Sequence, residues 1–120
     1  DLLASPYCLP ELVAVAGEIP TVLGGLTPQE LWTAYRTGAS AVQVVPCEAF
    51  GTAYARSLPE LVAEIPLLAT GRLEHYQAEL WLSSGAVGVW PTTLVSQDLV
   101  VDTDLGGLRA VCQRWRLGED

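Results

Sequence analysis

ASAVQVVP, at residues 39–46, is a nearly all-apolar run with one amide, Gln43, at its centre. A short run rich in β-branched residues that ends at proline predicts a strand buried on both faces, as in parallel sheets covered by helices. Alternate side chains of a strand point to the same side, so in a parallel barrel Gln43 would face the interior with Ala41 and Val45. It would lie near the carboxyl end of its strand, where barrel enzymes place their functional residues.

The same pattern of a strand followed by a helix recurs five times along the chain. Strands are expected to begin near residues 2, 19, 41, 65 and 86, a recurrence of roughly 20 residues that is typical of βα units. Helices are expected over residues 9–16, 27–38, 50–63, 73–84 and 108–115. Connections this short favour right-handed parallel crossovers, so the sequence predicts an α/β protein with a parallel sheet.

Local signals mark some of the boundaries. Thr27-Pro28-Gln29-Glu30 has the capping-box pattern with proline at the first helical position, which makes it the clearest helix start in the chain. Pro59 removes a backbone donor and is expected to break the third helix into two pieces. Residues 91–103, rich in Asp and Thr, are expected to form a loop.

The length of the chain predicts a single domain over residues 1–120. Closing a small barrel takes about eight strands, so five strands leave two alternatives open. Either three more βα units precede Asp1, as in a partial (β/α)8 TIM barrel, or the five strands form an open, doubly wound sheet.

The composition excludes some classes of partner. The formal net charge is −8, and all six basic residues are scattered arginines. Binding to nucleic acid or to an anionic membrane needs clustered basic residues, so neither partner is expected. The apolar runs fall short of the roughly 18 residues that cross a bilayer, and no signal-peptide pattern opens the chain, so a cytoplasmic protein is expected.

Several stretches are similar in residues and spacing to one enzyme family. They are IPTVLGGLTPQEL at 19–31, VQVVP at 42–46, Pro66 to Thr70-Gly71, GAVG at 85–88, and Ser5-Pro6 ahead of Pro10-Glu11-Leu12. Over these stretches the chain resembles the 2-keto-3-deoxy-6-phosphogluconate (KDPG) and 4-hydroxy-2-oxoglutarate (KHG) aldolases. The resemblance implies strands four to eight of a (β/α)8 barrel, usually trimeric, in an enzyme that cleaves or forms a carbon–carbon bond beside a pyruvyl group. It also implies a longer parent chain or a truncated product, because three family βα units, with a catalytic glutamate and a carboxylate-binding arginine, align before Asp1.

The chain differs from this family at the centre of the run at residues 39–46. The family's sixth strand carries a Schiff-base lysine, and the aligned residue here is Gln43. The lone pair of an amide nitrogen is delocalised, so it cannot attack a ketone to form the iminium that acts as the electron sink. The chain contains no lysine that could replace it. An aldolase-like pseudoenzyme without Schiff-base activity is therefore expected.

The alignment also implies a set of ligand-binding residues, namely Ser5, Pro46, Thr70, Gly71, Arg72 and Gly88. Relatives hold phosphate with a T-G-G turn and a Gly-Ser pair, through backbone N–H groups and helix N-termini. Here the turn is Thr70-Gly71-Arg72 and the last strand runs Gly88-Val89-Trp90-Pro91, so the family's phosphate cradle is not expected. Arg72 could instead supply charge to a small 2-oxo acid or a phosphorylated ligand. No cofactor and no metal are implied.

Other polar residues have simpler interpretations. Glu48 follows the Gln43 strand, at the end of the sheet where a general base would have to lie. The simpler interpretation is a carboxylate at the start of a helix, stabilised by the helix dipole. His75 is expected on the surface of its helix, and Cys47 is expected to be a small apolar filler. The three aspartates between residues 98 and 104 lack the pattern of a calcium loop, so a solvated acidic loop is expected.

Three functions stay open. The first is an aldolase-like protein without Schiff-base activity that keeps a small carboxylate or phosphate ligand and assembles as a homo-oligomer. The second is an active pyruvate-type lyase that uses a metal or another route without lysine. The third is a structural or protein-interaction module built on the aldolase fold, with its negative charge setting the preferred partner.

Overall fold

The computed structural model describes residues 1–116, so the last four residues of the expected single domain lie outside the described range. The strands are β1 (Leu3–Ala4), β2 (Thr21–Gly25), β3 (Ala41–Val44), β4 (Leu67–Gly71) and β5 (Gly88–Pro91). The helices are α1 (Pro10–Ala16), α2 (Pro28–Arg36), α3 (Gly51–Leu61), α4 (His75–Ser84), α5 (Gln97–Val101) and α6 (Leu105–Arg114). The five predicted βα units are present, with boundaries that differ from the expected ones by a few residues.

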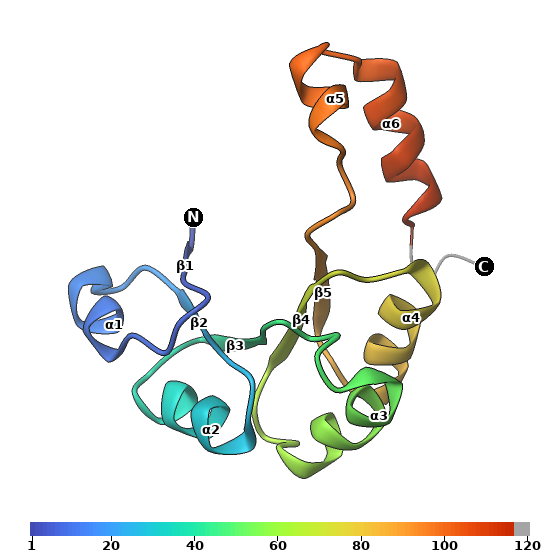
Figure 1. Ribbon diagram of the computed structural model, residues 1–120. Coiled ribbons are helices and arrows are strands. Elements are labelled where there is room, and N and C mark those ends of the chain that lie inside the picture. The colour runs from blue at the N-terminus through green and yellow to red at the C-terminus, as the bar shows by residue number, and fades with distance from the viewer. Residues whose placement is uncertain (117–120) are drawn as a thin grey trace.

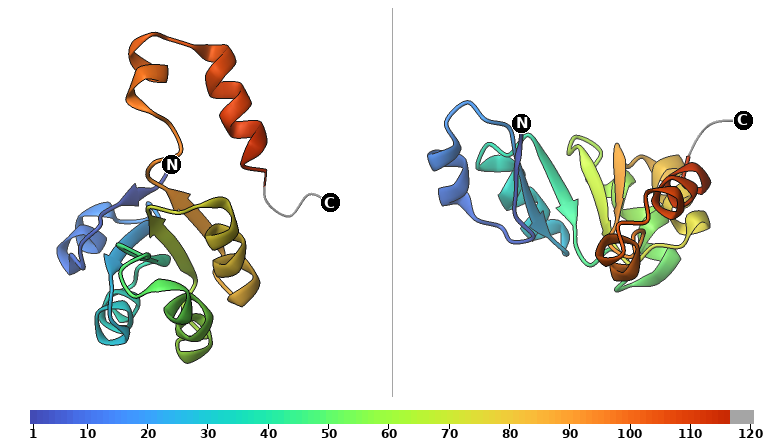
Figure 2. Two further views of the ribbon diagram at one scale, coloured as in Figure 1. Left: turned by 45° about the vertical axis from the view of Figure 1, so that its right-hand side comes forward. Right: turned by 90° about the horizontal axis from the view of Figure 1, so that it is seen from above.

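The five strands form one parallel sheet in which they pair in chain order, β1-β2-β3-β4-β5. A doubly wound sheet reverses its strand order at a switch point, so that alternative is wrong. The sheet curves, and α1 to α4 line its outer side (Figures 1 and 2). The described residues therefore form a half-barrel, and β1 and β5 are its two edges.

The core lies between the sheet and its outer helices. Val42 and Val44 of β3 are fully buried there, together with Leu23 of β2, Leu31 of α2 and Trp81 of α4. Each such side chain contributes about 1.5–3 kcal/mol through the apolar surface it buries. Because side chains alternate along a strand, these two valines leave the residue between them to face the inner side of the sheet.

Two of the sequence expectations about helices are wrong. Helix α3 is continuous from Gly51 to Leu61 with Pro59 inside it, so proline does not split it. The Pro59 ring is buried and lies close to Gly85, where an added Cβ would be 3.2 Å from it. Packing of this kind can outweigh one lost helical hydrogen bond, which contributes only about 0.5–1.5 kcal/mol.

The second wrong expectation is the loop at residues 91–103, because α5 forms within it. Helix α6 begins three residues earlier than predicted, since the Asp104 carboxylate accepts a hydrogen bond from the Gly107 N–H at 2.8 Å and caps it. The two helices project away from the half-barrel (Figure 1), and neither contains a buried residue. No helix within residues 1–116 is long and apolar enough to cross a membrane.

The helix start at Thr27 is confirmed. The Thr27 backbone N–H donates to Glu30 Oε1 at 3.1 Å, and both halves of the capping box are present. This contact lowers the pKa of the Glu30 carboxyl, chiefly through the hydrogen bond from the Thr27 side chain. A four-residue pattern is sufficient to predict this boundary because all its partners are neighbours in the chain.

Candidate functional site

An open hollow of about 250 Å³ lies on the inner side of the half-barrel. It is formed by side chains from four of the βα units and their exits, namely Ala4, Pro6, Gln43, Thr70, Trp90 and Thr92. Gln43 thus faces the interior, as the period of its strand predicts. None of these lining residues is charged, so any charge on a ligand must be balanced by groups at the rim.

Gln43 on β3 reaches across β2 to Ser5, the residue that directly follows β1. Its side-chain nitrogen donates to the Ser5 carbonyl oxygen at 2.8 Å, and only 4% of the residue is exposed. Gly24 of β2 pairs with Gln43 and lies between the two partners. A Cβ on Gly24 would be 2.2 Å from the Pro6 carbonyl oxygen, so glycine is required for this close approach.

Thr70 supplies the one buried side-chain nitrogen or oxygen atom that the described part of the chain leaves without a hydrogen-bond partner. The residue is 7% exposed, and its hydroxyl oxygen Oγ1 makes no hydrogen bond within residues 1–116. Leaving such a group unpaired costs about 1–3 kcal/mol. A ligand that exchanges a hydrogen bond with this hydroxyl would recover part of that cost.

Glu48 spans two loops at the carboxyl ends of β3 and β4. Its Oε2 accepts a hydrogen bond from the Arg72 backbone N–H at 3.0 Å. Helix α3 starts beyond it at the N-cap Phe50 and has no acidic residue in its first turn, so the helix-start interpretation of Glu48 is wrong. The carboxylate instead stabilises the turn Thr70-Gly71-Arg72.

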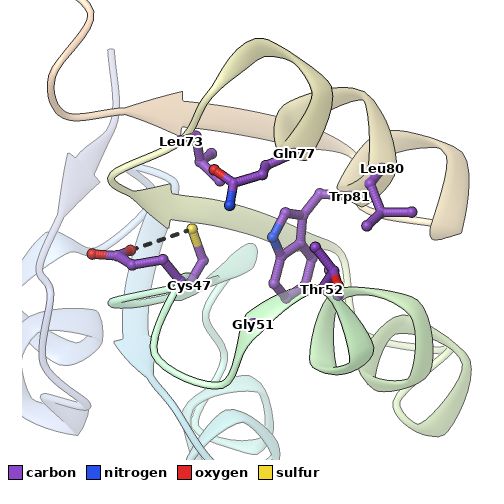
Figure 3. A pocket seen from close by; sticks show the side chains of 9 residues that line it. Cys47, Gly51, Thr52, Leu73, Gln77, Leu80 and Trp81 are labelled. Carbon is purple, nitrogen blue, oxygen red and sulfur yellow. Dashed lines mark hydrogen bonds between the residues drawn. The ribbon is translucent and has the colours of Figure 1, made fainter.

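A second, much smaller pocket of about 10 Å³ lies between α3 and α4, behind this carboxylate. Cys47, Thr52, Gln77 and Trp81 face it (Figure 3), and the dashed line there joins Cys47 Sγ to Glu48 Oε2 at 3.9 Å. Its volume suits a single water molecule. Burial, assisted by the charge of Glu48, raises the pKa of Cys47 to about 12. The thiol is therefore a buried filler, as predicted, and not a nucleophile.

The remaining predicted site residues are spread more widely. Pro46 is exposed in the turn after β3, and Gly88 lies at the amino end of β5, paired with Leu68. Ser5 takes part through its carbonyl, while its hydroxyl oxygen accepts the Tyr7 N–H at 3.1 Å. The structure thus brings Gln43 and Thr70 to the hollow, with Ser5 bonded to Gln43 and with Gly71 and Arg72 in the adjoining turn.

His75 has a surface position on α4, as expected. Its Nδ1 lies 3.6 Å from a carboxylate oxygen of Glu79, and its ring is tilted against Trp115 with centroids 5.6 Å apart. Neither partner is among the residues that line the hollow. His75 is therefore not part of the candidate site.

Trp90 and Thr92 line the hollow, although the sequence pattern marks Trp90 only as an obstacle to phosphate. Trp90 is 50% exposed and pairs in register with Thr70. Partners in a parallel register face the same side of a sheet, so the strand alignment could have placed Trp90 beside Thr70. The signal in the sequence is that Gly88, Trp90 and Thr92 are two residues apart, the spacing of side chains on one side of a strand.

Solved structures share this fold. The 4-hydroxy-2-oxoglutarate aldolase/2-deydro-3-deoxyphosphogluconate aldolase from TTHB1 superposes with a TM-score of 0.73 at 27% identity, over 96% of this chain and 58% of that one. The native KDPGal structure gives 0.73 at 22% identity, over 95% and 59%. Thiamine phosphate pyrophosphorylase from Pyrococcus furiosus gives 0.63 at 22% identity, over 98% and 60%.

The chain spans less than two thirds of the length of each of these proteins. No protein-family profile and no curated protein matches it. The comparisons establish an aldolase-like fold in which five parallel βα units form part of a TIM barrel.

Proposed function

We propose that this chain is a KDPG/KHG aldolase-like protein that has no Schiff-base activity and holds a small 2-oxo acid in its hollow. The observation that carries the proposal is the position of Gln43. Its amide lies in the hollow and is hydrogen-bonded through its nitrogen to Ser5, and the sequence resemblance aligns this position with the family lysine. An amide held in this way positions the neighbouring backbone but cannot form an iminium with a ketone.

Two groups support a carboxylate ligand. Thr70 lines the hollow, and its hydroxyl, buried and without a hydrogen-bond partner within residues 1–116, is the candidate donor to a carboxylate oxygen. Arg72 follows two residues later and is exposed, so its guanidinium is the candidate cation for the same ligand. A hydrogen bond to a charged group contributes about 1.5–3 kcal/mol, which suits a weakly held small molecule.

Borohydride trapping with pyruvate tests the loss of Schiff-base chemistry. The full protein is treated with both reagents, digested, and analysed by mass spectrometry. We expect no adduct at Gln43 or at any other side chain of these residues, because they contain no lysine. A trapped side-chain adduct here, or lysine-independent retro-aldol activity, would overturn the proposal, and activity that needs a divalent metal would favour the active-lyase alternative.

Titration with pyruvate tests the binding half of the proposal. We expect saturable binding followed by NMR or calorimetry, and a loss of about tenfold in affinity for Thr70→Val, which removes the hydroxyl at nearly constant volume. Thr70→Ser is the matched control, because it keeps the hydroxyl and should bind within a few-fold of the unchanged protein. Equal binding by the valine and serine variants would exclude Thr70 as a ligand contact.

A homo-oligomer is a second part of the proposal, as the resemblance to the aldolases implies. Leu2 and Leu3 at β1 and Trp90 on β5 are all exposed at the two edges of the half-barrel. Strand edges with exposed apolar side chains pair with further strands of the same protein or with another copy of it. Light scattering on the full protein should therefore give a mass above that of one chain, and a monomeric mass at micromolar concentration would contradict this.

A further inference from the structure

We infer that Trp90 makes the hollow prefer 2-oxo acids whose third carbon carries an aromatic ring over pyruvate itself. The inference rests on the proposed binding of a 2-oxo acid and adds a substrate class to it. Trp90 is thus a specificity-determining residue, which contacts the side chain of the ligand while the Thr70 hydroxyl contacts its polar end.

Trp90 has an indole surface that the rest of the described chain leaves uncovered. The residue is 50% exposed, and no aromatic ring or guanidinium of residues 1–116 packs on it. The other three tryptophans each have such a partner: Trp32 has Arg36, Trp81 has Tyr54, and Trp115 has His75. Because aromatic side chains pack favourably on other rings, this unpartnered indole is available to a ring of a ligand.

The register of the sheet places Trp90 beside the two polar residues of the hollow. Trp90 on β5 pairs with Thr70 on β4. Gln43 on β3 pairs with Leu68, which lies two residues before Thr70. Gln43, Thr70 and Trp90 are therefore on the same side of three successive strands, and such strands are about 4.8 Å apart. A ligand that hydrogen-bonds to Thr70 consequently has the indole next to it.

The lining of the hollow suits an uncharged ring. Ala4, Pro6 and Trp90 contribute carbon surface, and none of the lining residues is charged. The volume of about 250 Å³ is close to the lower end, about 300 Å³, of pockets that hold drug-sized ligands. Pyruvate, with three carbons, would leave much of this space to water, whereas an aromatic side chain would displace water from the indole. Removing apolar surface from water favours the larger ligand.

The hydrogen-bonding groups of the hollow suit the polar end of such a ligand. The Thr70 hydroxyl is buried and has no partner within residues 1–116, so it is the candidate donor to an oxygen of the acid. The Gln43 nitrogen already donates to the Ser5 carbonyl, which leaves the oxygen of its amide as an acceptor. The enol hydroxyl of an aryl 2-oxo acid, which conjugation with the ring stabilises, supplies a matching donor.

Titration of the full protein with three 2-oxo acids tests the inference. Pyruvate has no side chain beyond its methyl group, 4-methyl-2-oxopentanoate has a branched aliphatic one, and phenylpyruvate has an aromatic one. We expect calorimetry to show that phenylpyruvate binds about tenfold more tightly than pyruvate, with the aliphatic acid in between. The indole N–H signal of Trp90 in NMR spectra should shift saturably with phenylpyruvate, at the same dissociation constant.

Two matched variants separate Trp90 from an exposed indole elsewhere. Trp90→Leu keeps an apolar side chain but removes the ring, so phenylpyruvate affinity should fall about tenfold, to that of pyruvate. Its affinity for pyruvate should stay within a few-fold of that of the unchanged protein. Trp32→Leu removes an indole on α2 that is 39% exposed and does not line the hollow, so this variant should bind all three acids like the unchanged protein.

Three results would overturn the inference. They are equal affinity of the unchanged protein for pyruvate and phenylpyruvate, an aliphatic acid that binds as tightly as the aromatic one, and equal phenylpyruvate binding by the Trp90→Leu and Trp32→Leu proteins. The first two need no variant, so they decide the matter even if Trp90→Leu does not fold. Pyruvate binding without an aromatic preference leaves the proposed function standing, whereas failure of all three acids to bind contradicts the proposed function itself.

Discussion

The Gln43 side-chain nitrogen lies 2.8 Å from the Ser5 carbonyl oxygen, so β3 is joined to the exit of β1 over the top of the strand between them. This contact links the first and third βα units across the second. It gives a buried amide a structural function at the position where related enzymes are expected to carry an amine. The following predictions test this contact and the parts of the fold that support it.

Replacing Gln43 by leucine should destabilise the fold by about 1–3 kcal/mol, because it leaves the Ser5 carbonyl without its buried partner. Gln43→Glu should be more damaging at neutral pH, since its carboxylate would face a carbonyl oxygen that has no proton to donate. Urea unfolding at pH 7 measures both. A leucine variant as stable as the unchanged protein would show that the contact contributes nothing.

Replacing Gly24 by alanine should cost about 1–3 kcal/mol or more, because its Cβ would meet the Pro6 carbonyl oxygen at 2.2 Å and the backbone must move. The matched control is Gly106→Ala near the start of α6, where the nearest atom would be 3.6 Å away. Alanine is favoured over glycine in a helix by about 1 kcal/mol, so this control should be neutral or stabilising. In thermal unfolding, the melting temperature should fall for Gly24→Ala and should stay the same or rise for Gly106→Ala.

Cys47 should resist alkylation in the folded protein, whereas the exposed Cys112 should react. Burial, with the charge of Glu48, raises the pKa of Cys47 to about 12, so almost no thiolate forms at pH 8. The unfolded thiol titrates near 9.0, so the unfolded state loses its proton first and stability should fall as the pH rises from about 9 towards 12. Mass spectrometry after iodoacetamide treatment at pH 8 checks the first point, and rapid labelling of Cys47 would contradict it.

The capping box of α2 should make stability depend on pH in the acid range. Hydrogen bonds from Thr27 lower the pKa of the Glu30 carboxyl below its ordinary value of 4.5. Its contribution is therefore complete above that value and is lost as the pH falls through the lowered pKa of the folded state. Glu30→Gln should show a weaker acid dependence than the unchanged protein in unfolding curves between pH 2 and 6. The difference should be at most about 1 kcal/mol, because the contact is exposed to solvent.

Much of the architecture follows from patterns that involve neighbours in the chain. The alternation of side chains predicts that Gln43 faces away from Val42 and Val44, and the structure confirms it. The capping box at Thr27 is equally local. Pro59 shows the limit of such signals. Its ring removes a hydrogen bond from α3, but it is buried beside Gly85, and no local sequence pattern predicts that contact.

The sequence by itself determined five parallel βα units, a buried amide on the inner side of the third strand, and the absence of any lysine. Only the tertiary structure decided that the strands follow chain order in a half-barrel, that Trp90 lies beside Thr70, and that Glu48 binds the Arg72 N–H across 24 positions in the chain. The physical reason is the distance along the chain over which the interactions act. Periodicity and capping report energies between neighbours, whereas the contacts that shape this site join residues that meet only after the curvature and register of the whole sheet are set.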